Sequence, residues 1–450
     1  MKTVLNNGGS PSTIVREKNL YAVKIGICGL GTVGKGTLNV INRNRVEISA
    51  RAGCEIVVSH IGARRGAEID GVKVSTDIFA VAEDPEVNIL VELIGGTTVA
   101  KDLIMLAIAN GKHVVTANKA LIAEHGNEIF HAAEKQGVCV AFEAAVAGGI
   151  PIIKAIREGL AANKIEWLAG IINGTGNFIL SEMREKGRDF SDVLQEAQDL
   201  GYAEADPTFD VEGVDAAHKL VILASLAFGI PLQFDKVYTE GITKISVQDV
   251  DYAEELGYRI KHLGVARKTA NGVELRVHPT LIPEQRLIAN VNGVMNAILV
   301  HGDAVGPTLY YGAGAGAEPT ASSVIADIVD IARSLSADPK HRVPYLAFHP
   351  HALNDTRILG ISEIETAYYL RMLAEDKPGV LSRVAQILSD GGISIEAISQ
   401  KPPTASADHV PLVILTNRSL ESELVAAISK IESLENIEGE VTRIRVESLG

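Results

Sequence analysis

Apolar positions in the first third of the chain form short runs that are separated by segments with helical spacing. Runs rich in Val and Ile are typical of strands buried on both faces of a parallel sheet. The predicted strands are Tyr21 to Cys28, Glu55 to Ile61, NILVELIGG from Asn88, HVVTAN from His113 and VCVAFEA from Val138. One helix is predicted after residues 29–34 and up to about Ser49. Two more are predicted over Ala100 to Asn110 and over Ala120 to Gln136. This alternation predicts an α/β fold with a doubly wound parallel sheet.

The regular alternation ends after Lys164. The strands predicted beyond it are IEWLAGIIN from Ile165, Gly241 to Ser246, Arg259 to Ala266 and Val273 to Leu281. Helical segments are predicted over Gly174 to Lys186, over Ser191 to Leu200, and from Val214 or Asp215 onward. We therefore expect an α+β domain with a mixed sheet that is suited to holding a substrate.

A glycine loop follows, and it runs into a helix over Gly312 to Asp330 with Pro319 near the first helical turn. We expect this loop, which contains Gly314, to return and cover the nucleotide site described below.

The last part of the chain has a different order of elements. Residues 337–365 lack strong periodicity and contain several prolines, so a connecting segment is predicted. The elements that follow are a strand over Thr366 to Ala374, a turn at Asp376 to Gly379, a helix over Val380 to Asp390, strands over Ile393 to Gln400 and Val410 to Thr416, a helix over Leu420 to Ile431, and a strand over Gly439 to Val446. This order is βαββαβ, the ferredoxin-like arrangement.

A chain of 450 residues is too long for one core, and about three domains are expected. The predicted division is a flexible tail over 1–20, a nucleotide-binding domain over 21–150 completed by part of 312–336, a substrate-binding and dimerisation domain over 151–336, a linker over 337–365, and a C-terminal domain over 366–450.

Charge and cysteine content limit the expected binding partners and the cellular compartment of the protein. A net charge of -14 argues against nucleic acid or an anionic membrane as a partner. We expect this charge to serve only to keep the protein soluble. Cys28, Cys54 and Cys139 lie in apolar, strand-like surroundings, which favours a reduced, cytoplasmic protein. We expect no transmembrane run and no signal peptide.

A nucleotide-binding motif joins the first predicted strand to the first helix. Residues 29–34 read GLGTVG and match G-x-G-x-x-G, in which successive glycines make the turn, admit a pyrophosphate and allow helix and strand to pack closely. The phosphates would lie at the helix N-terminus. The cofactor-binding residues predicted here are Gly29, Gly31, Thr32, Val33 and Gly34. A purely structural glycine turn is the alternative.

Cofactor preference depends on the end of the second strand, where an acidic residue would bind the ribose of NAD. Arg64 and Arg65 stand there instead, which favours NADP; a solvated arginine pair or dual use of NAD and NADP is the alternative. Ligands bind beyond the carboxyl ends of such strands, where Thr97 and Lys119 are predicted to lie. Lys119 would then open toward the nicotinamide site, and a surface lysine that starts a helix is the alternative.

The stretch from Asp199 to Leu220 combines the most ionisable groups with an apolar helix. Asp215 and Lys219 are spaced i and i+4, so they share one helix face as an ion pair, and Glu204 lies in the loop before them. A carboxylate would bind the ammonium of a small amino acid, and a partly buried lysine would transfer a proton. A capped surface helix with an ordinary salt bridge is the alternative.

Several motifs together resemble the homoserine dehydrogenase family along most of the chain. They are GLGTVG, TANKA from Thr116, FEAAVAGGIP from Phe142, INGTGNFI from Ile172, LGYAEADPTFDVEGVDAAHKL from Leu200 and GAGAGAEPTASSV from Gly312. The resemblance implies reversible NAD(P)-dependent oxidation of L-homoserine to L-aspartate 4-semialdehyde, a step of threonine, methionine and isoleucine biosynthesis.

The resemblance also implies roles for individual residues. Lys219 and Asp215 are similar to the active-site pair, Glu204 to the group that orients the substrate, and Lys119 to the lysine between nicotinamide and substrate. Which lysine transfers the proton stays open at this point, and we favour Lys219.

The loop FEAAVAGGIP has one carboxylate among small residues, so its oxygens could hold a monovalent cation. The loop also resembles the family's sodium site. The implied ligands are Glu143 and the carbonyls of Val146, Gly148 and Ile150.

The C-terminal βαββαβ unit, with its EDKPGVLSRVAQILSDGGISI opening, resembles an ACT domain. ACT domains typically pair with copies of themselves and bind amino acids at the strand-to-helix loop. The resemblance implies L-threonine as a feedback effector and a homodimer or homotetramer. The alternative is a domain that only dimerises.

Two other functions are alternatives to a homoserine-type dehydrogenase. A phosphate-dependent semialdehyde dehydrogenase needs a nucleophilic cysteine in an open, electropositive site, whereas all three cysteines are predicted to be buried in strands. A catalytically weak sensor of amino acids and nucleotides on the same fold would have less need of Lys119, Glu204, Asp215 and Lys219.

Overall fold

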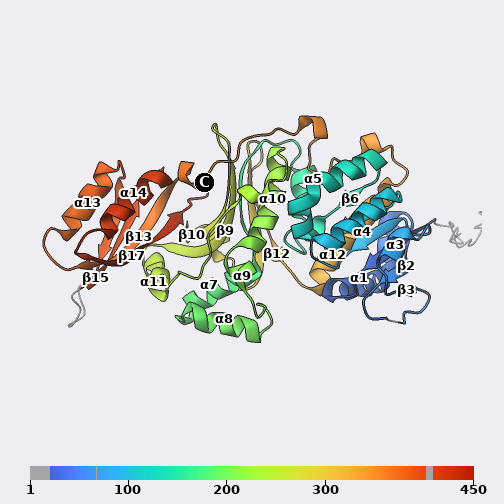
Figure 1. Cartoon of the computed structure of the whole chain (residues 1–450), viewed down its shortest axis with the longest axis horizontal. Helices are drawn as coiled ribbons and strands as arrows, with labels where there is room; N and C mark the ends of the chain where they lie inside the picture. The colour runs from blue at the N-terminus through green and yellow to red at the C-terminus, as the bar shows by residue number, and fades with distance from the viewer. Residues whose placement is uncertain (1–20, 67, 402–408) are drawn as a thin grey trace, which may run out of the picture.

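The computed structural model describes residues 21–66, 68–401 and 409–450. Three structural units lie in a row along the longest axis, with the N-terminal unit at one end and the C-terminal unit at the other (Figure 1). The predicted tail over residues 1–20 lies outside the described residues. Within the described part of the chain, no helix is long and apolar enough to cross a membrane.

The first unit is built on a six-stranded parallel sheet in the order β3-β2-β1-β4-β5-β6. Its strands are β1 (Ala22–Cys28), β2 (Glu55–Gly62), β3 (Lys73–Ser75), β4 (Ile89–Glu92), β5 (His113–Thr116) and β6 (Val140–Ala141). Strand β4 is buried at every position, as its continuous apolar run requires in a sheet covered on both faces. The predicted doubly wound sheet is confirmed, with the strand order of the Rossmann fold.

Helices cover both faces of this sheet, and one of them comes from much later in the chain. They are α1 (Thr32–Arg43), α2 (Arg45–Ala52), α3 (Phe79–Glu83), α4 (Thr98–Ala109), α5 (Lys119–Gln136) and α12 (Ala317–Ser334). Helix α12 packs on α1 so closely that a Cβ at Gly36 would lie 2.4 Å from the carbonyl oxygen of Ala317. The Arg43 guanidinium donates to Glu318 at 2.7 and 3.0 Å across the same contact.

The middle unit is a mixed sheet with helices on its flanks. Its strands are β7 (Ile165–Ile171), β8 (Tyr238–Thr239), β9 (Tyr258–Lys268), β10 (Val273–Pro283), β11 (Met295–Gly302) and β12 (Gly306–Ala313). Its helices are α6 (Ile152–Lys154), continued by a π-helical turn over Ala155–Gly159, and α7 (Gly174–Lys186), α8 (Phe190–Asp199), α9 (Thr208–Val211), α10 (Val214–Phe228) and α11 (Val247–Glu255). Helix α10 is buried from Asp215 to Phe228, because its side chains are apolar nearly all round.

The predicted strand over Gly241 to Ser246 is wrong. This segment is a loop whose Ile242 N–H donates to the carbonyl of Val211 at 3.0 Å. Ser246 ends the loop as the N-cap of α11, where it forms a capping box with Asp249. Strands β11 and β12 were not predicted, and β6 ends before Glu143, which begins a 3-10 turn.

The C-terminal unit has the predicted βαββαβ order. Its elements are β13 (Glu365–Glu375), α13 (Val380–Asp390), β14 (Ile395–Gln400), β15 (His409–Thr416), the short β16 (Ser419–Leu420), α14 (Glu421–Glu432) and β17 (Ile437–Val446). Its four main strands lie in the order β17-β13-β15-β14, with both helices on one face (Figure 1). The ferredoxin-like prediction is confirmed.

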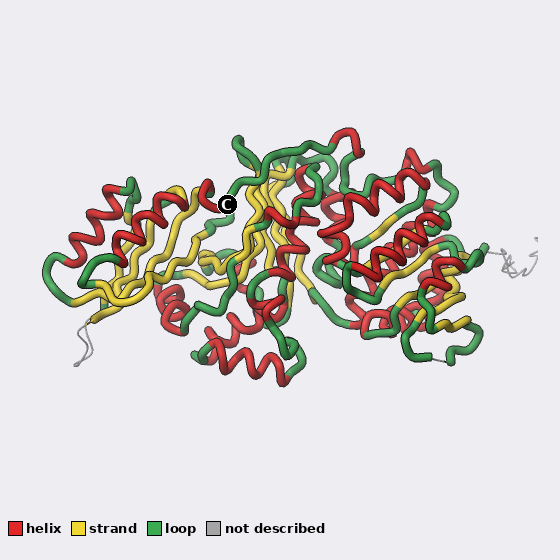
Figure 2. The backbone as a smooth tube through the Cα atoms, viewed as in Figure 1, coloured by secondary structure: helices red, strands yellow, loops and turns green. Residues whose placement is uncertain are grey.

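The C-terminal sheet continues the sheet of the middle unit. Strand β17 pairs in parallel with β10, with Thr280 opposite Arg445 and Leu281 opposite Val446. The result is a single eleven-stranded sheet, visible in Figure 2 as continuous strands from the middle of the molecule to one end. Residues 337–365 form the covalent connection and contain short 3-10 turns, among them Pro350–Ala352 and Ile361–Glu363. The C-terminal unit is therefore joined by main-chain hydrogen bonds as well as by a connecting segment.

Candidate active site

The first turn of α10 presents a buried ion pair. Gly213 precedes the helix with a φ of +85°, a conformation that favours glycine. The Nζ of Lys219 lies 2.7 Å from Asp215 Oδ2 and also donates to the carbonyl of Ile172 at 2.6 Å. Asp215 is 4% exposed and Lys219 is 9% exposed. The predicted pairing is present, and the burial of both groups contradicts the alternative of a surface salt bridge.

A second lysine reaches the same carboxylate from the nucleotide-binding unit. Lys119 opens α5, immediately after the N-cap Asn118, and its Nζ lies 3.0 Å from Asp215 Oδ1. Its side chain stays 34% exposed and passes over the Phe209 ring at 5.8 Å. Helices α5 and α10 lie side by side where the two units meet (Figure 1). Asp215 thus links a lysine from each unit.

Burial and charge set the ionisation of this cluster. Burial lowers the pKa of Lys219 from its ordinary value of 10.5, although the Asp215 carboxylate acts in the opposite direction. Burial alone would raise the pKa of Asp215, but the ammonium groups of Lys219 and Lys119 outweigh it and hold that pKa below its ordinary value. The site therefore keeps a carboxylate charged and brings a lysine closer to proton transfer at moderate pH.

Two residues that the sequence reasoning gave no role complete the cluster. Asn173, which caps α7, donates from Nδ2 to Asp215 Oδ2 at 2.9 Å and to Asp210 Oδ1 at 2.8 Å. Burial raises the pKa of Asp210. Asn173 stands at the end of β7 within the INGTGNFI motif, so its position after a buried strand was the available signal.

Glu204 lies on the exposed loop between α8 and α9. Among the described residues, its carboxylate makes no hydrogen bond or ion pair with Lys119, Asp215 or Lys219. Its carbonyl oxygen accepts from Gln198 Nε2 at 3.0 Å. The structure brings together Lys119, Asp215 and Lys219 and leaves Glu204 outside their contacts.

The glycine motif has the geometry expected of a nucleotide turn. Gly29 has a φ of +104°, and a Cβ there would lie 2.6 Å from the carbonyl oxygen of Leu93. A Cβ at Gly34 would lie 2.0 Å from the carbonyl oxygen of Gly29, so this glycine permits the close packing of helix on turn. A Cβ at Gly31 would meet no atom within 4 Å, which leaves its backbone open to a ligand. Thr32 and Val33 begin α1 directly after Gly31.

The other predicted nucleotide residues lie along the same edge of the sheet. Thr97 precedes α4, and Arg64 and Arg65 are exposed just beyond β2. The turn after β4 is held by the buried Glu92, whose Oε1 accepts from the N–H groups of Ile94 and Gly95 at 2.8 and 3.0 Å. Thr97, Arg64 and Arg65 therefore lie beyond the carboxyl ends of the strands, where doubly wound sheets bind their ligands.

Comparison with known proteins agrees with this architecture along most of the chain. Family models described as "Homoserine dehydrogenase, NAD binding domain", "Homoserine dehydrogenase" and "ACT domain" match residues 29–143, 151–329 and 368–433. A homoserine dehydrogenase of Pseudomonas aeruginosa is 66% identical over 430 residues, which cover 95% of this chain and 99% of the relative. The chain belongs to the homoserine dehydrogenase family.

Solved structures extend the comparison. A homoserine dehydrogenase from Thiobacillus denitrificans matches with a TM-score of 0.91 and 62% identity, covering 95% of this chain and 99% of the other. A hyperthermophilic archaeal homoserine dehydrogenase in complex with NADPH matches with a TM-score of 0.59 and 27% identity, over 69% of this chain and 97% of the other. The resemblance inferred from sequence motifs is confirmed, and with it an oxidoreductase that has a nucleotide-binding domain and an ACT domain.

The predicted cation loop is a buried turn. The carboxylate of Glu143 accepts from the N–H groups of Ile153 and Lys154 at 2.8 and 2.9 Å, so it caps the start of α6. The carbonyl of Gly148 accepts from Ser323 Oγ at 2.6 Å, and Gly148 abuts Gly314, whose carbonyl oxygen would lie 2.5 Å from an added Cβ. Val146 and Ile150 are buried in the same turn. The described residues contain no cluster of three or more His, Cys, Asp or Glu side chains suited to a metal.

The cysteines do not provide a nucleophilic site. Burial raises the pKa of Cys28 to about 12, and it also raises the pKa of Cys139. Cys54 and Cys139 precede β2 and β6 rather than lying within strands, and Cys139 is only half-buried, which corrects the prediction for them. None of these thiols has the lowered pKa that cysteine catalysis requires.

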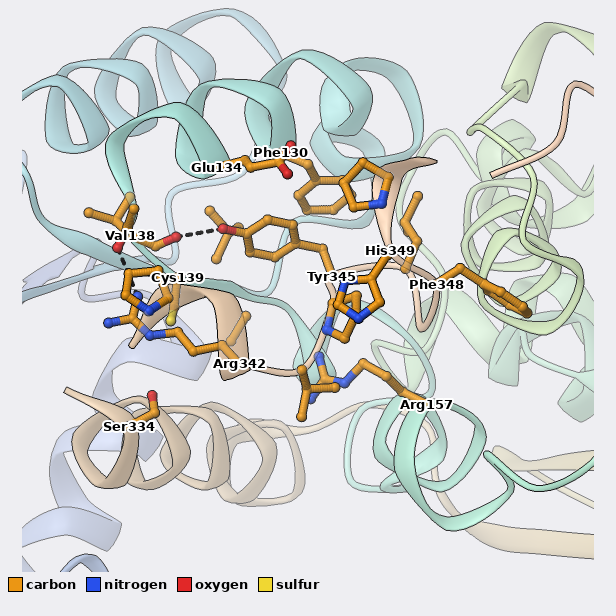
Figure 3. Close-up of a pocket in the computed structure, with 18 of the residues that line it drawn as sticks. Phe130, Glu134, Val138, Cys139, Arg157, Ser334, Arg342, Tyr345, Phe348 and His349 are labelled. Atoms are coloured by element: carbon orange, nitrogen blue, oxygen red, sulfur yellow. Dashed lines mark hydrogen bonds between the residues drawn. The ribbon is translucent and has the colours of Figure 1, made fainter. Parts of the chain in front are cut away.

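A cavity of about 900 Å³ lies away from the lysine cluster, between α5, α12 and the connecting segment (Figure 3). Arg157, Arg342 and Tyr345 contribute to its lining, and Tyr345 Oη donates to the carbonyl of Val138. Lys119, Asp215 and Lys219 do not line it, so this cavity is separate from the candidate active site.

Proposed function

We propose that the chain catalyses the reversible NAD(P)-dependent oxidation of L-homoserine to L-aspartate 4-semialdehyde, with Lys119, Asp215 and Lys219 as its active-site groups. The observation that supports this assignment is the position of Asp215, 3.0 Å from one lysine of the nucleotide-binding unit and 2.7 Å from another of the middle unit. Groups from both units meet at the place where cofactor and substrate would have to meet.

Lys219 is the proposed proton-transfer group. During oxidation the hydroxyl proton of homoserine passes to its neutral amine, and during reduction its ammonium returns a proton to the forming alkoxide. The contacts with Asp215 and the carbonyl of Ile172 hold the amine in place for both directions. The cofactor supplies the hydride acceptor or donor.

Lys119 and Glu204 are proposed to position the substrate. Lys119 is the more exposed lysine and stands at the end of β5, where the nicotinamide site is expected. Glu204 would contact the substrate's ammonium group, as its place in the family motif implies.

The direct test is reduction of each nicotinamide cofactor by L-homoserine. The purified chain should reduce NADP⁺ and, in the reverse direction, oxidise NADPH with L-aspartate 4-semialdehyde. A chain that binds cofactor and amino acids but shows no turnover would instead support the sensor function, which the intact cluster of Lys119, Asp215 and Lys219 disfavours.

We propose NADP as the preferred cofactor. Arg64 and Arg65 are exposed beyond β2, where they can pair with a 2′-phosphate, and the archaeal relative is described in complex with NADPH. The turn at Gly29, Gly31 and Gly34 would hold the pyrophosphate, and the loop at Gly314 lies beside the neighbouring Gly148 turn.

We also propose sodium at the Glu143–Ile150 turn. Main-chain oxygens and a carboxylate are donors that hard cations prefer, and the burial of Glu143, Val146 and Ile150 supports the proposal. The carbonyls of Val146, Gly148 and Ile150 would serve as ligands together with Glu143. Replacing sodium by choline should lower the melting temperature of the protein. An unchanged melting temperature would mean that sodium does not bind at this turn.

The proposed effector is L-threonine, bound at the Asp376–Gly379 turn of the ACT domain. Gly379 has a φ of +95° and precedes α13, so the turn leads into a helix N-terminus as amino-acid sites of this module do. Threonine should inhibit the wild type and act at least tenfold more weakly on Asp376→Ala. Equal inhibition of both would place the effector elsewhere, and no inhibition of either would leave a domain that only dimerises.

The assembly is proposed to be a homodimer or homotetramer in the cytoplasm, serving threonine, methionine and isoleucine biosynthesis. Strands β12 and β14 form the two ends of the eleven-stranded sheet in this chain. Unpaired strand edges favour association with another chain. Light scattering should give two or four times the mass of one chain.

A further inference from the structure

Arg445 is a buried cation at the boundary between the C-terminal unit and the middle unit. It lies on β17, is 0% exposed, and donates to Glu421 of its own unit. Its second partner is Glu240 of the middle unit, with Nη1 at 2.8 Å from Oε2. Tyr238 Oη donates to the same Glu240 oxygen at 2.7 Å. Glu240 is also held by Arg443 at 3.5 Å and by its own N–H, which donates to the carbonyl of Val277 at 2.8 Å, so the Arg445 contact helps to hold the Glu240 carboxylate in place.

Glu240 begins the loop that packs against the residues preceding α10. In this loop Ile242 donates its N–H to the carbonyl of Val211 at 3.0 Å. Gly241 is so close to the opposite segment that a Cβ there would lie 2.3 Å from Glu212 Oε2 and 2.8 Å from the carbonyl oxygen of Val211. Movement of Glu240 would therefore be transmitted to Val211 and Glu212 by direct contact.

His262 makes a second connection between Glu240 and α10. Its Nε2 lies 3.0 Å from the carbonyl oxygen of Glu240. Its ring packs on Gly213, where an added Cβ would lie 3.1 Å from Cε1. Gly213 is the N-cap of α10, and Asp215 stands in the first turn of that helix. Two contacts thus run from Glu240 to the start of the helix that carries Asp215 and Lys219.

We propose that Glu240 and Arg445 are positioning residues for the dehydrogenase reaction, through which the C-terminal unit holds the first turn of α10 in register with Lys119. Asp215 contacts Lys119 only because α10 begins at the right place relative to α5. Catalytic groups must be held to within about half an ångström, so a small shift of this turn lowers turnover. The proposal rests on the roles given above to Asp215 and Lys219.

The same contact connects the proposed effector site to the reaction. Strand β13 leads into the Asp376–Gly379 turn and pairs with β17 along its length. A ligand that shifts β13 would act on Arg445, and through Glu240 on the first turn of α10. Weakening the Glu240–Arg445 contact should therefore reduce the response to threonine together with turnover.

The test compares four variants with the full-length wild type. Glu240→Gln and Arg445→Met each remove the ion pair between residues 240 and 445, and Arg445→Lys retains the charge. Arg371→Met is the matched control, because the half-buried Arg371 makes another ion pair between the same units, 2.6 Å from the buried Asp249 on α11. For each variant we would measure kcat, the KM values for L-homoserine and NADP⁺, and the melting temperature.

Glu240→Gln and Arg445→Met should lower kcat at least tenfold with KM for NADP⁺ within twofold, and Arg445→Lys should recover part of the loss. Arg371→Met should lower the melting temperature but keep kcat within twofold. The proposal is overturned if Glu240→Gln keeps wild-type kcat, or if Arg371→Met loses as much turnover as Arg445→Met. Glu240→Gln only replaces a carboxylate oxygen by an NH2 group and should fold. It therefore still tests the proposal if Arg445→Met does not fold. Lys219→Ala tests the underlying catalytic roles separately.

Discussion

Lys119 and Asp215 lie on helices of different structural units, yet the lysine amine is 3.0 Å from the carboxylate. The other oxygen of Asp215 accepts from Lys219 on its own helix at 2.7 Å. One buried carboxylate therefore fixes the relative positions of two amines, one beside the nucleotide-binding sheet and one inside the middle unit.

Asp215→Asn should lower kcat for homoserine oxidation by at least a hundredfold. The substitution keeps the shape of the side chain but leaves two ammonium groups without their shared anion, and breaking such a buried pair costs about 3–5 kcal/mol. Steady-state kinetics and thermal melting would measure both effects. Asp206→Asn, on the exposed loop before α9, is the control and should change neither.

The pH dependence of turnover should follow the ionisation of Lys219. Because burial lowers the pKa of this lysine, kcat for oxidation should rise with pH to a midpoint below 10.5, as the neutral amine that accepts the proton becomes populated. Reduction of the semialdehyde needs the ammonium and should decline over the same range.

The Asp215 carboxylate opposes the effect of burial, so residual activity of Asp215→Asn should show a midpoint at lower pH than the wild type. A midpoint that does not move would mean that another group controls the profile.

Arg64→Ser combined with Arg65→Ser should raise KM for NADP⁺ about tenfold or more and leave KM for NAD⁺ nearly unchanged. Both guanidinium groups are exposed beyond β2 and are available to a 2′-phosphate, which NAD⁺ lacks. Arg51→Ser removes an exposed arginine from α2 and should alter neither constant. Equal changes in KM for NADP⁺ and NAD⁺ would mean that the two arginines attract both cofactors by their charge and do not recognise the 2′-phosphate.

Removing residues 366–450 should destabilise the remaining protein rather than release an independent module. The deletion strips β17 from β10 and leaves the buried Arg276 without Glu447, its partner at 2.6 Å. We expect a melting temperature lower by more than about 5 °C, or insoluble protein. A truncated chain that melts like the full-length protein would show that the joined sheets contribute little.

Local patterns in the sequence predicted the elements that depend on near neighbours. The i, i+4 spacing was enough to pair Asp215 with Lys219, and the glycine motif was enough to place a turn before α1. The helix over Val380 to Asp390 was predicted with the correct bounds, because its apolar spacing and the preceding Pro-Gly turn agree.

Features that depend on long-range packing could not be predicted. A strand was predicted over Gly241 to Ser246, but Ile242 and Ile245 are buried at a spacing of three residues, which fits a loop folded onto the core and not a strand of period two. The pairing of β10 with β17 joins segments far apart in sequence and has no local signal. The same holds for the Lys119–Asp215 contact, which depends on how two units dock.

The burial of the Asp215–Lys219 pair is a fourth such feature. The sequence was equally compatible with a surface salt bridge, because spacing alone does not say which side of a helix is covered. The structure shows α10 enclosed by its surroundings along nearly its whole length, and this enclosure is what lowers the pKa of Lys219.

The most direct test of the catalytic account is the turnover of Lys219→Ala with L-homoserine and NADP⁺, measured on protein whose circular dichroism and NADPH affinity match the wild type. We predict that kcat declines by two orders of magnitude or more while KM for NADP⁺ stays within about threefold. A folded variant that oxidises homoserine at a rate close to that of the wild type would contradict the account, because the proton would then have another acceptor.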